Sequence, residues 1–301
     1  MFFFSYIYIY NKKCVTLRTV FKHLLMIEVT EHTIDVNALL RSKMGNKANK
    51  VPNFVTNWLQ RIIHQDEINS ILWANKDLSE IEWVDSVLKQ LKVNVEVKGI
   101  ENLPPTNDEK RYTFCSNHPL GGLDGLLIAQ LLGHQYNGNI RLLVNDLLLN
   151  LPGLAPLCVP VNTVAHKSNR GTSEAINKAF DDGYNMFFFP AGLCSRKIKG
   201  KIQDLPWTKT FLVKSIEHKR DIVPMHTSGR NSNKFYHIAN ICQMLHSPIN
   251  VAMLYLADEL FRNTNKTFTI TVGKPIPWQT FDKSKTPLQW AEYVRNKVYE
   301  L

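Results

Sequence analysis

Phe114-Cys-Ser-Asn-His118-Pro-Leu-Gly121-Gly122-Leu-Asp124 is the stretch that decides the fold and the chemistry expected of this chain. An apolar run typical of a β-strand, residues 112–116, leads into a Gly-rich turn that carries a histidine and a carboxylate. An imidazole titrates near neutrality, so it can take a proton from a hydroxyl group. A carboxylate beside it fixes its tautomer and stabilises the imidazolium that forms. The glycines let the backbone turn sharply enough for the two side chains to meet, although the same stretch could serve only as a strand end and a helix start.

A second strand-like run ends in a similar turn, at Phe187-Phe-Phe-Pro190-Ala-Gly192-Leu-Cys-Ser195-Arg196-Lys197. The polar residues that follow this turn are cationic. An arginine is suited to a carboxylate or a phosphate because its guanidinium can donate two parallel hydrogen bonds. The two turns together predict a site that combines a general base with an anion-binding group.

The two turns, in this order, resemble motifs of the glycerophospholipid acyltransferase superfamily, which includes the bacterial lysophosphatidic acid acyltransferases. The first motif of that family is Asn-His, four residues, then Asp, and here Asn117-His118 is followed by five residues before Asp124. The third motif, Phe-Pro-Glu-Gly-Thr-Arg-Ser, resembles the stretch from Phe189 to Arg196. Weaker matches are Ile222 to Met225 and the segment from Pro160 to Gly171. The resemblance covers roughly residues 90 to 275.

The resemblance implies an α/β fold, a layered mixed β-sheet flanked by helices. It implies an acyltransferase that moves a fatty acyl group from a thioester to a lysolipid hydroxyl in membrane lipid biosynthesis. In this reading His118 takes the proton of the acceptor hydroxyl and Asp124 orients the histidine. Acyl carrier protein or coenzyme A carries the acyl group as co-substrate, and no bound cofactor or metal is implied. The residues expected to bind substrate or to hold the oxyanion are Asn117, Gly121, Gly122, Arg170, Pro190, Gly192, Ser195 and Arg196.

Two departures from the family pattern bear on the site. The spacing from His118 to Asp124 is one residue longer, and we expect Gly121 and Gly122 to absorb the extra residue. Ala191 stands where the third motif of the family has an acidic residue that helps to hold the acceptor. This difference favours an acceptor other than an ordinary lysophosphatidic acid, with lyso-aminolipids of the ornithine or glycine kind as candidates.

The composition is that of a basic globular protein. The chain has 301 residues, 44% of them hydrophobic, and a formal net charge of +10. A basic surface favours anionic partners, but no zinc-finger spacing or compact Lys/Arg run points to nucleic acid. An anionic membrane surface and an acyl carrier protein fit better, and the alternative is that scattered lysines only aid solubility. We therefore expect a peripheral protein at the cytoplasmic face of the cell membrane.

The cysteines and the opening residues bear on the compartment. Five cysteines without a Cys-x-x-Cys spacing indicate a reducing compartment. Cys194 lies in the second turn, but no histidine is near it in the sequence, and we do not expect it to be a nucleophile. No apolar stretch approaches the ~20 residues that a transmembrane helix needs. Residues 1–10 are rich in aromatics and are either an interfacial anchor or the result of a misassigned start, with Met26 as the other candidate.

The remaining pattern interleaves helices and strands, as in layered α/β folds. Helices are expected from Pro52 to about residue 63 and from Ser79, where Ser79-x-x-Glu82 predicts a capping box. Later helices are expected at residues 126–132, 173–182, 208–218, 234–245 and from 286, and strands at 93–97, 141–144, 157–161, 186–189, 221–225 and 267–272. The predicted domains are an N-terminal tail (1–50), a helical lead (51–92) and a catalytic domain (93–301). The amphipathic helices of the lead (51–92) serve either to associate with the membrane or to pack against the core.

Two other functions stay open on the sequence alone. A lipid or ester hydrolase could use the same His-Asp pair to activate water, although no Gly-x-Ser-x-Gly elbow occurs, which counts against a serine hydrolase. A non-catalytic lipid-binding homologue is the other alternative. Ala191 supports it, and the presence of both His118 and Asp124 counts against it.

Overall fold

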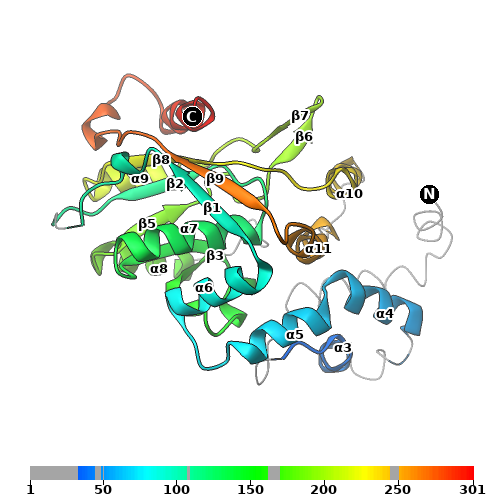
Figure 1. Ribbon diagram of the computed structural model, residues 1–301. Helices are drawn as coiled ribbons and strands as arrows, with labels where there is room; N and C mark the ends of the chain where they lie inside the picture. Colours follow the sequence, from blue (N-terminus) through cyan, green and yellow to red (C-terminus); the bar gives the residue numbers. More distant parts are fainter. Residues whose placement is uncertain (1–32, 45–48, 50, 107–108, 162–169, 245–250) are drawn as a thin grey trace.

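The computed structural model describes residues 33–44, 49, 51–106, 109–161, 170–244 and 251–301 (Figure 1). The predictions for the opening aromatic residues and for a start at Met26 lie outside these ranges. The same holds for residues 162–169 of the weaker motif that ends at Gly171.

The centre of the molecule is a mixed, seven-stranded sheet with the order β1-β9-β8-β2-β5-β3-β4. Neighbouring strands run parallel except for β8 and β9, which are antiparallel. The strands are β1 (Asn94–Lys98), β2 (Thr113–Ser116), β3 (Ile140–Asn145), β4 (Cys158–Val161), β5 (Asn185–Phe188), β8 (Ile222–Thr227) and β9 (Thr267–Val272). This architecture confirms the mixed sheet flanked by helices that the sequence predicts.

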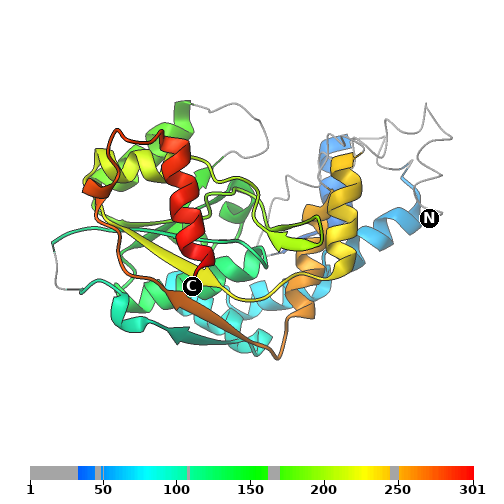
Figure 2. The same ribbon diagram turned by 90° about the horizontal axis from the view of Figure 1, so that it is seen from above.

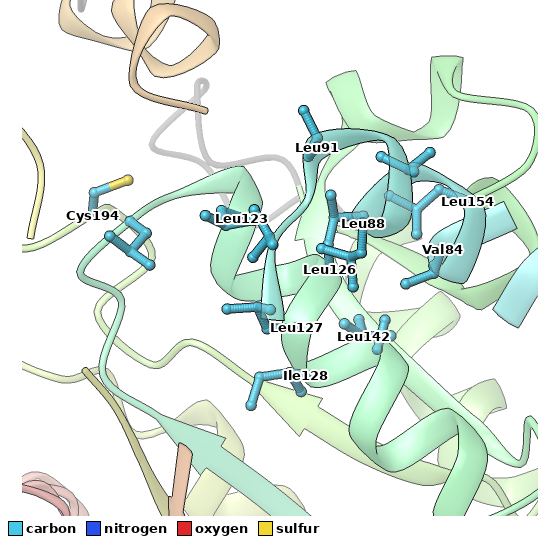
Figure 3. Packing of buried hydrophobic residues seen from close by; sticks show 14 of the residues in the cluster. Val84, Leu88, Leu91, Leu123, Leu126, Leu127, Ile128, Leu142, Leu154 and Cys194 are labelled. Carbon is cyan, nitrogen blue, oxygen red and sulfur yellow. The ribbon is translucent and has the colours of Figure 1, made fainter. Parts of the chain in front are cut away.

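Side chains of the central strands alternate between two apolar clusters, one on each face of the sheet. On one face, Phe114 and Phe187 pack with α6 (Glu80–Leu91) and α7 (Gly122–Gln135). On the other, Cys115 and Phe188 pack with α8 (Arg170–Asp181), α9 (Thr210–Glu217) and α12 (Pro287–Tyr299). Figure 3 shows Val84, Leu88 and Leu91 of α6 beside the leucines of α7. The strands are thus covered on both faces, as their apolar runs require.

A capping box forms at the last helix but not at the predicted position, Ser79. At the start of α12, the Gln289 amide donates to the Thr286 hydroxyl over 3.3 Å, and the Thr286 amide donates to the Gln289 side chain over 2.8 Å. The box predicted at Ser79 is wrong, because the Ser79 side chain makes no capping hydrogen bond. Glu80 instead has a left-handed backbone (φ 54°), and its amide donates to the Gly153 carbonyl over 2.7 Å. This contact fixes the start of α6 in place of the serine.

The N-terminal helices are α3 (Val36–Met44), α4 (Asn53–Ile62) and α5 (Gln65–Ala74). Figures 1 and 2 show them at one side of the molecule, near α10 (Asn233–Met244) and α11 (Tyr255–Arg262). Leu39 and Leu40 of α3 are buried, so this part of the predicted tail packs as a helix. The helix α6, assigned to the lead from the sequence, packs on α7 in the core. None of the helices in the described ranges combines the length and the apolar character needed to cross a bilayer.

Three neighbouring parallel strands position the site. The sheet order places β2 between β8 and β5, so the carboxyl ends of these strands lie at one edge. The turn that carries His118 follows β2, and the turn that carries Arg196 follows β5. A short hairpin that the sequence analysis did not predict, β6 (Arg196–Ile198) and β7 (Lys201–Gln203), continues from the second turn. Ligands of open α/β sheets bind at such an edge.

Candidate active site

The imidazole of His118 and the carboxylate of Asp124 meet as the sequence predicts. The Nδ1 of His118 lies 2.9 Å from the Oδ2 of Asp124. The Asp124 side chain is fully buried, whereas the His118 side chain is 16% exposed. Because Nδ1 is engaged by the carboxylate, Nε2 is the ring nitrogen left for proton transfer.

The turn between the two residues absorbs the longer spacing at Gly121. This glycine has a φ of +81°, in the left-handed region that side chains rarely adopt. Its amide and that of Leu120 donate to the Oδ2 of Asp124 over 3.1 and 2.8 Å, so the carboxylate also caps the start of α7. Gly122 is the first residue of α7 and has open space beside it. The turn therefore depends on Gly121, and Gly122 is not needed for its backbone conformation.

Two residues of the second turn contact the His118 ring, and the sequence analysis assigned neither to the site. The ring stacks on Phe189, with centroids 3.9 Å apart and planes 22° apart. The sulfur of Cys194 lies close enough to the imidazole to raise the pKa of His118. It also lies beside the start of α7, 3.1 Å from where a Cβ on Gly121 would be (Figure 3). No histidine is near Cys194 in the sequence, but the fold brings together two turns that are distant in the sequence and places His118 beside it.

The surroundings of the pair favour the protonated imidazole. Burial alone would lower the pKa of His118, but the Cys194 sulfur and the Asp124 carboxylate outweigh burial and raise the pKa to about 10. Burial raises the pKa of Asp124, while the hydrogen bond and charge of His118 and the two turn amides oppose this rise. A histidine with a raised pKa is a strong base once it has lost its proton. It also holds the transferred proton well until the proton is passed on.

Asn117 and Ser195, which the sequence predicts to bind substrate, make hydrogen bonds that hold the turns in place. Asn117 is buried, and its side-chain amide both donates to and accepts from the backbone of Thr227, at 2.9 and 2.8 Å. The Ser195 hydroxyl donates to Asp204 over 2.6 Å, and the Ser195 amide donates to the His118 carbonyl over 2.8 Å. These bonds join β2 to β8 and the first turn to the second. The predicted contact of both residues with substrate stays a prediction.

Of the three glycines expected to supply an oxyanion donor, one keeps its amide free. The Gly121 amide donates to Asp124, and the Gly192 amide donates to the Phe189 carbonyl over 2.9 Å. The Gly122 amide has no acceptor among the described residues. It lies at the amino end of α7, where the helix dipole favours negative charge.

Arg196 is a buried cation without an acidic partner among the described residues. Its side chain is buried, and its Nη1 donates to the carbonyl oxygen of Cys194 over 2.5 Å. The guanidinium also lies 5.6 Å from the centre of the Phe235 ring. A buried charge is costly unless it is paired. Arg196 is therefore suited to an anionic ligand, as the sequence predicts.

Comparisons with known proteins show the family of this chain. A family model described as an acyltransferase matches residues 38–301. The chain belongs to the glycerophospholipid acyltransferase superfamily. It is 53% identical over 268 residues to a lyso-glycine lipid O-acyltransferase of Bacteroides thetaiotaomicron, covering 89% of this chain and 97% of that protein. A protein of the same name from Phocaeicola vulgatus is 51% identical over 268 residues, covering 89% and 95%. The crystal structure of the 1-acyl-sn-glycerophosphate acyltransferase PlsC from Thermotoga maritima aligns with a TM-score of 0.40 and 16% identity, over 82% of this chain and 96% of that one.

Three further residues of the acyltransferase motifs have defined places. The Pro190 carbonyl accepts hydrogen bonds from the amide and the hydroxyl of Thr208, so this residue fixes the second turn. Ala191 is partly buried and packs against the cluster on the α9 face. Arg170 is the first residue of α8, and its side chain lies outside the described part of the structure. Its predicted contact with substrate therefore stays a prediction.

Proposed function

We propose that this acyltransferase moves a fatty acyl group from the thioester of acyl carrier protein or coenzyme A to the hydroxyl of a lyso-glycine lipid. The observation that carries the proposal is the contact between His118 and Asp124, and the buried Arg196 of the second turn supports it. The two relatives, each more than half identical to this chain, are named for that acceptor. The reaction would serve membrane lipid biosynthesis.

The chemistry needs no covalent enzyme intermediate, because a thioester is already activated. His118 takes the proton of the acceptor hydroxyl on Nε2 while the oxygen attacks the thioester carbonyl. Asp124 stabilises the imidazolium through Nδ1. When the tetrahedral intermediate collapses, the carbon–sulfur bond breaks and the imidazolium returns the proton to the leaving thiolate. The products are the acylated lipid and the free thiol of the carrier, and His118 is neutral again.

The Gly122 amide is our candidate for the oxyanion donor. It is the one glycine amide of the three that no other group of the described residues engages. A donor of this kind typically lowers the barrier by about 3 kcal/mol. The exposed backbone of Gly122, with no neighbour within 4 Å of a Cβ, leaves room for a carbonyl oxygen to approach.

Arg196 would bind the acidic end of the acceptor or a phosphate of the acyl carrier. A glycine attached to a lipid through its nitrogen keeps a single carboxylate, and a guanidinium can bind a carboxylate through two parallel hydrogen bonds. The alanine at position 191 leaves this arginine without a carboxylate from its own motif. Both features suit an anionic lyso-aminolipid.

Association with an anionic membrane surface is part of the proposal. The net charge of the chain is +10. Phe54 of α4 and Trp73 of α5 are 66% and 60% exposed, and Lys76 lies 4.3 Å from the Trp73 ring. Exposed aromatics beside cations are suited to the interface of the bilayer at the cytoplasmic face of the membrane.

A lysolipid panel tests the proposal. Labelled acyl carrier protein and acyl coenzyme A are each offered with lyso-glycine lipid, lyso-ornithine lipid and lysophosphatidic acid, and both acylated lipid and free fatty acid are measured. We expect lyso-glycine lipid to be acylated fastest. Preference for lysophosphatidic acid would contradict the proposed acceptor, release of free fatty acid would indicate a hydrolase, and binding without turnover would indicate a lipid-binding protein.

A further inference from the structure

Asp204 is a buried acidic residue that belongs to neither motif and lies nine positions after Ser195. It directly follows β7 and is 2% exposed. No cationic side chain in the described part of the chain lies within ion-pair distance of its carboxylate. Burying a carboxylate is costly unless hydrogen bonds satisfy its oxygens. The residues that donate hydrogen bonds to the Asp204 carboxylate are therefore the residues that it holds in place.

The carboxylate joins the two turns of the active site. Its Oδ1 accepts hydrogen bonds from the Ser195 hydroxyl over 2.6 Å and from the His118 amide over 3.2 Å. Its Oδ2 accepts from the indole N–H of Trp207 over 3.0 Å. The Trp207 ring packs edge-on against Phe211 of α9, which fixes the indole in turn.

Both polar main-chain atoms of His118 depend on this arrangement. The His118 N–H donates to Asp204, and the His118 carbonyl accepts from the amide of Ser195 over 2.8 Å. Asp124 and Phe189 hold the imidazole ring but not the peptide to which it is attached. The position of the base is thus set by two separate groups of contacts, one on the ring and one on the backbone.

The C-terminal helix α12 holds Asp204 itself. The Asp204 amide donates to the Tyr299 hydroxyl over 2.8 Å, and the Asp204 carbonyl accepts from Arg295 over 3.2 Å. The main chain at Asp204 is thus anchored to a helix that packs in the core.

We propose that Asp204 is a positioning residue that holds the His118 backbone so that Nε2 faces the acceptor hydroxyl. This inference rests on the proposed role of His118 as general base. A displacement of about 1 Å at a catalytic group can cost ~10²-fold in rate. Loss of the carboxylate should therefore lower the rate of chemistry while leaving the binding of both substrates nearly unchanged.

The test uses three variants of the full chain. Asp204→Ala removes all three acceptor contacts, and we expect kcat to fall ~10²-fold with KM for lysolipid and thioester within threefold. Asp204→Asn keeps one acceptor oxygen, but its NH2 group then faces one of the three donors. That donor loses its hydrogen bond. Asp204→Asn combined with Trp207→Phe removes the indole donor, so the asparagine oxygen can serve Ser195 and His118. We expect this double variant to recover most of the kcat that the single Asn variant loses.

Controls separate positioning from stability. Asn185→Ala removes a buried hydrogen bond to the Tyr112 amide at the opposite end of β5, so it should lower the melting temperature without lowering kcat. Crystal structures of Asp204→Asn and the double variant should show the His118 ring displaced from Asp124 in the first and restored in the second. The inference is overturned if Asp204→Ala keeps kcat within twofold of wild type, or if the two Asn variants have equal kcat. If the wild-type protein acylates no lysolipid, the proposed function fails. The positioning role is tested independently by the two crystal structures, and it is overturned if His118 keeps its wild-type position in both.

Discussion

The imidazole of His118 stacks on the ring of Phe189, with centroids 3.9 Å apart, although the two residues follow different strands. The stack fixes the plane of the imidazole, and the bond to Asp124 fixes its rotation within that plane. Nε2 is therefore directed before the substrate arrives. A preorganised base loses little entropy when the acceptor binds, which is how position contributes to rate.

The charge of Asp124 can be separated from its geometry by substitution. The Oδ1 of Asp124 is buried and has no hydrogen-bond partner among the described residues, so Asp124→Asn can place its NH2 there and keep its oxygen on His118 and the turn amides. Asp124→Ala loses both charge and orientation. We expect the Asn variant to lose ~10²-fold in kcat and the Ala variant more, at unchanged KM. Steady-state kinetics check this, and wild-type kcat in either variant would remove Asp124 from the mechanism.

The activity should rise with pH. The pKa of His118 is raised, and catalysis needs the neutral imidazole, so kcat/KM should increase as pH climbs towards about 10. The Cys194 sulfur contributes to the raised pKa, so Cys194→Ser should lower the pKa of His118 and move the acidic limb of the profile to lower pH.

The same variant tests whether Cys194 is a nucleophile. If the acyl group passes directly to the lipid, Cys194→Ser keeps its maximal kcat within a few-fold of wild type and no acyl-enzyme accumulates. Mass spectrometry after mixing enzyme and thioester without acceptor is the decisive readout. A stoichiometric acyl group on Cys194 would contradict the direct mechanism.

The oxyanion donor can be removed at Gly122 with a matched control. Gly122 is the first residue of α7, a position where proline is tolerated because the helix does not use that N–H. Gly122→Pro should fold and lose ~10²-fold or more in kcat, because the amide donor is gone. Gly122→Ala keeps the amide, and with open space around it should stay near wild type. Equal kcat in the two variants, at equal melting temperature, would exclude this amide as the donor.

Arg196 should discriminate between the two substrates. Arg196→Ala should raise the KM for lyso-glycine lipid by ~10-fold or more, because a charge-assisted bidentate contact is lost, and should affect the thioester less. Arg196→Lys keeps the positive charge but cannot donate two parallel hydrogen bonds. Its KM for lyso-glycine lipid should therefore lie between those of the wild type and Arg196→Ala. Initial rates at varied concentrations of each substrate give the KM for lyso-glycine lipid and the KM for the thioester. A larger effect on the thioester would assign Arg196 to the carrier phosphate instead.

The chain indicates much of the fold because its strands are short, apolar and bounded by turn residues. The strand predicted at residues 267–272 is β9 itself, and the helix predicted from 286 begins at its capping box. The helices α3, α5 and α11 were not predicted. Their apolar residues are interrupted by polar ones, and α5 is preceded by His64, whose left-handed backbone carries no sequence signal. The Ser79 box failed because a tertiary contact at Glu80 replaced a local one.

The candidate site was predicted where its residues share a motif and was not predicted where they meet only in space. His118 and Asp124 are six positions apart, so their contact follows from one turn. Cys194 and Asp204 reach His118 only because β5 lies beside β2 in the sheet, an order that spacing does not reveal. Asn117 and Ser195 match the motifs, but motif letters do not show whether a polar side chain faces substrate or another turn.

The most direct test of the account is acyl transfer by His118→Ala, measured in a single turnover with labelled thioester and lyso-glycine lipid beside the wild-type protein. The ring contacts lie at one edge of the sheet, so the variant should keep its fold, checked by its melting temperature. We expect the rate to fall ~10²–10⁴-fold with little change in lipid binding. A folded variant that transfers the acyl group within a few-fold of the wild-type rate would show that His118 is not the base.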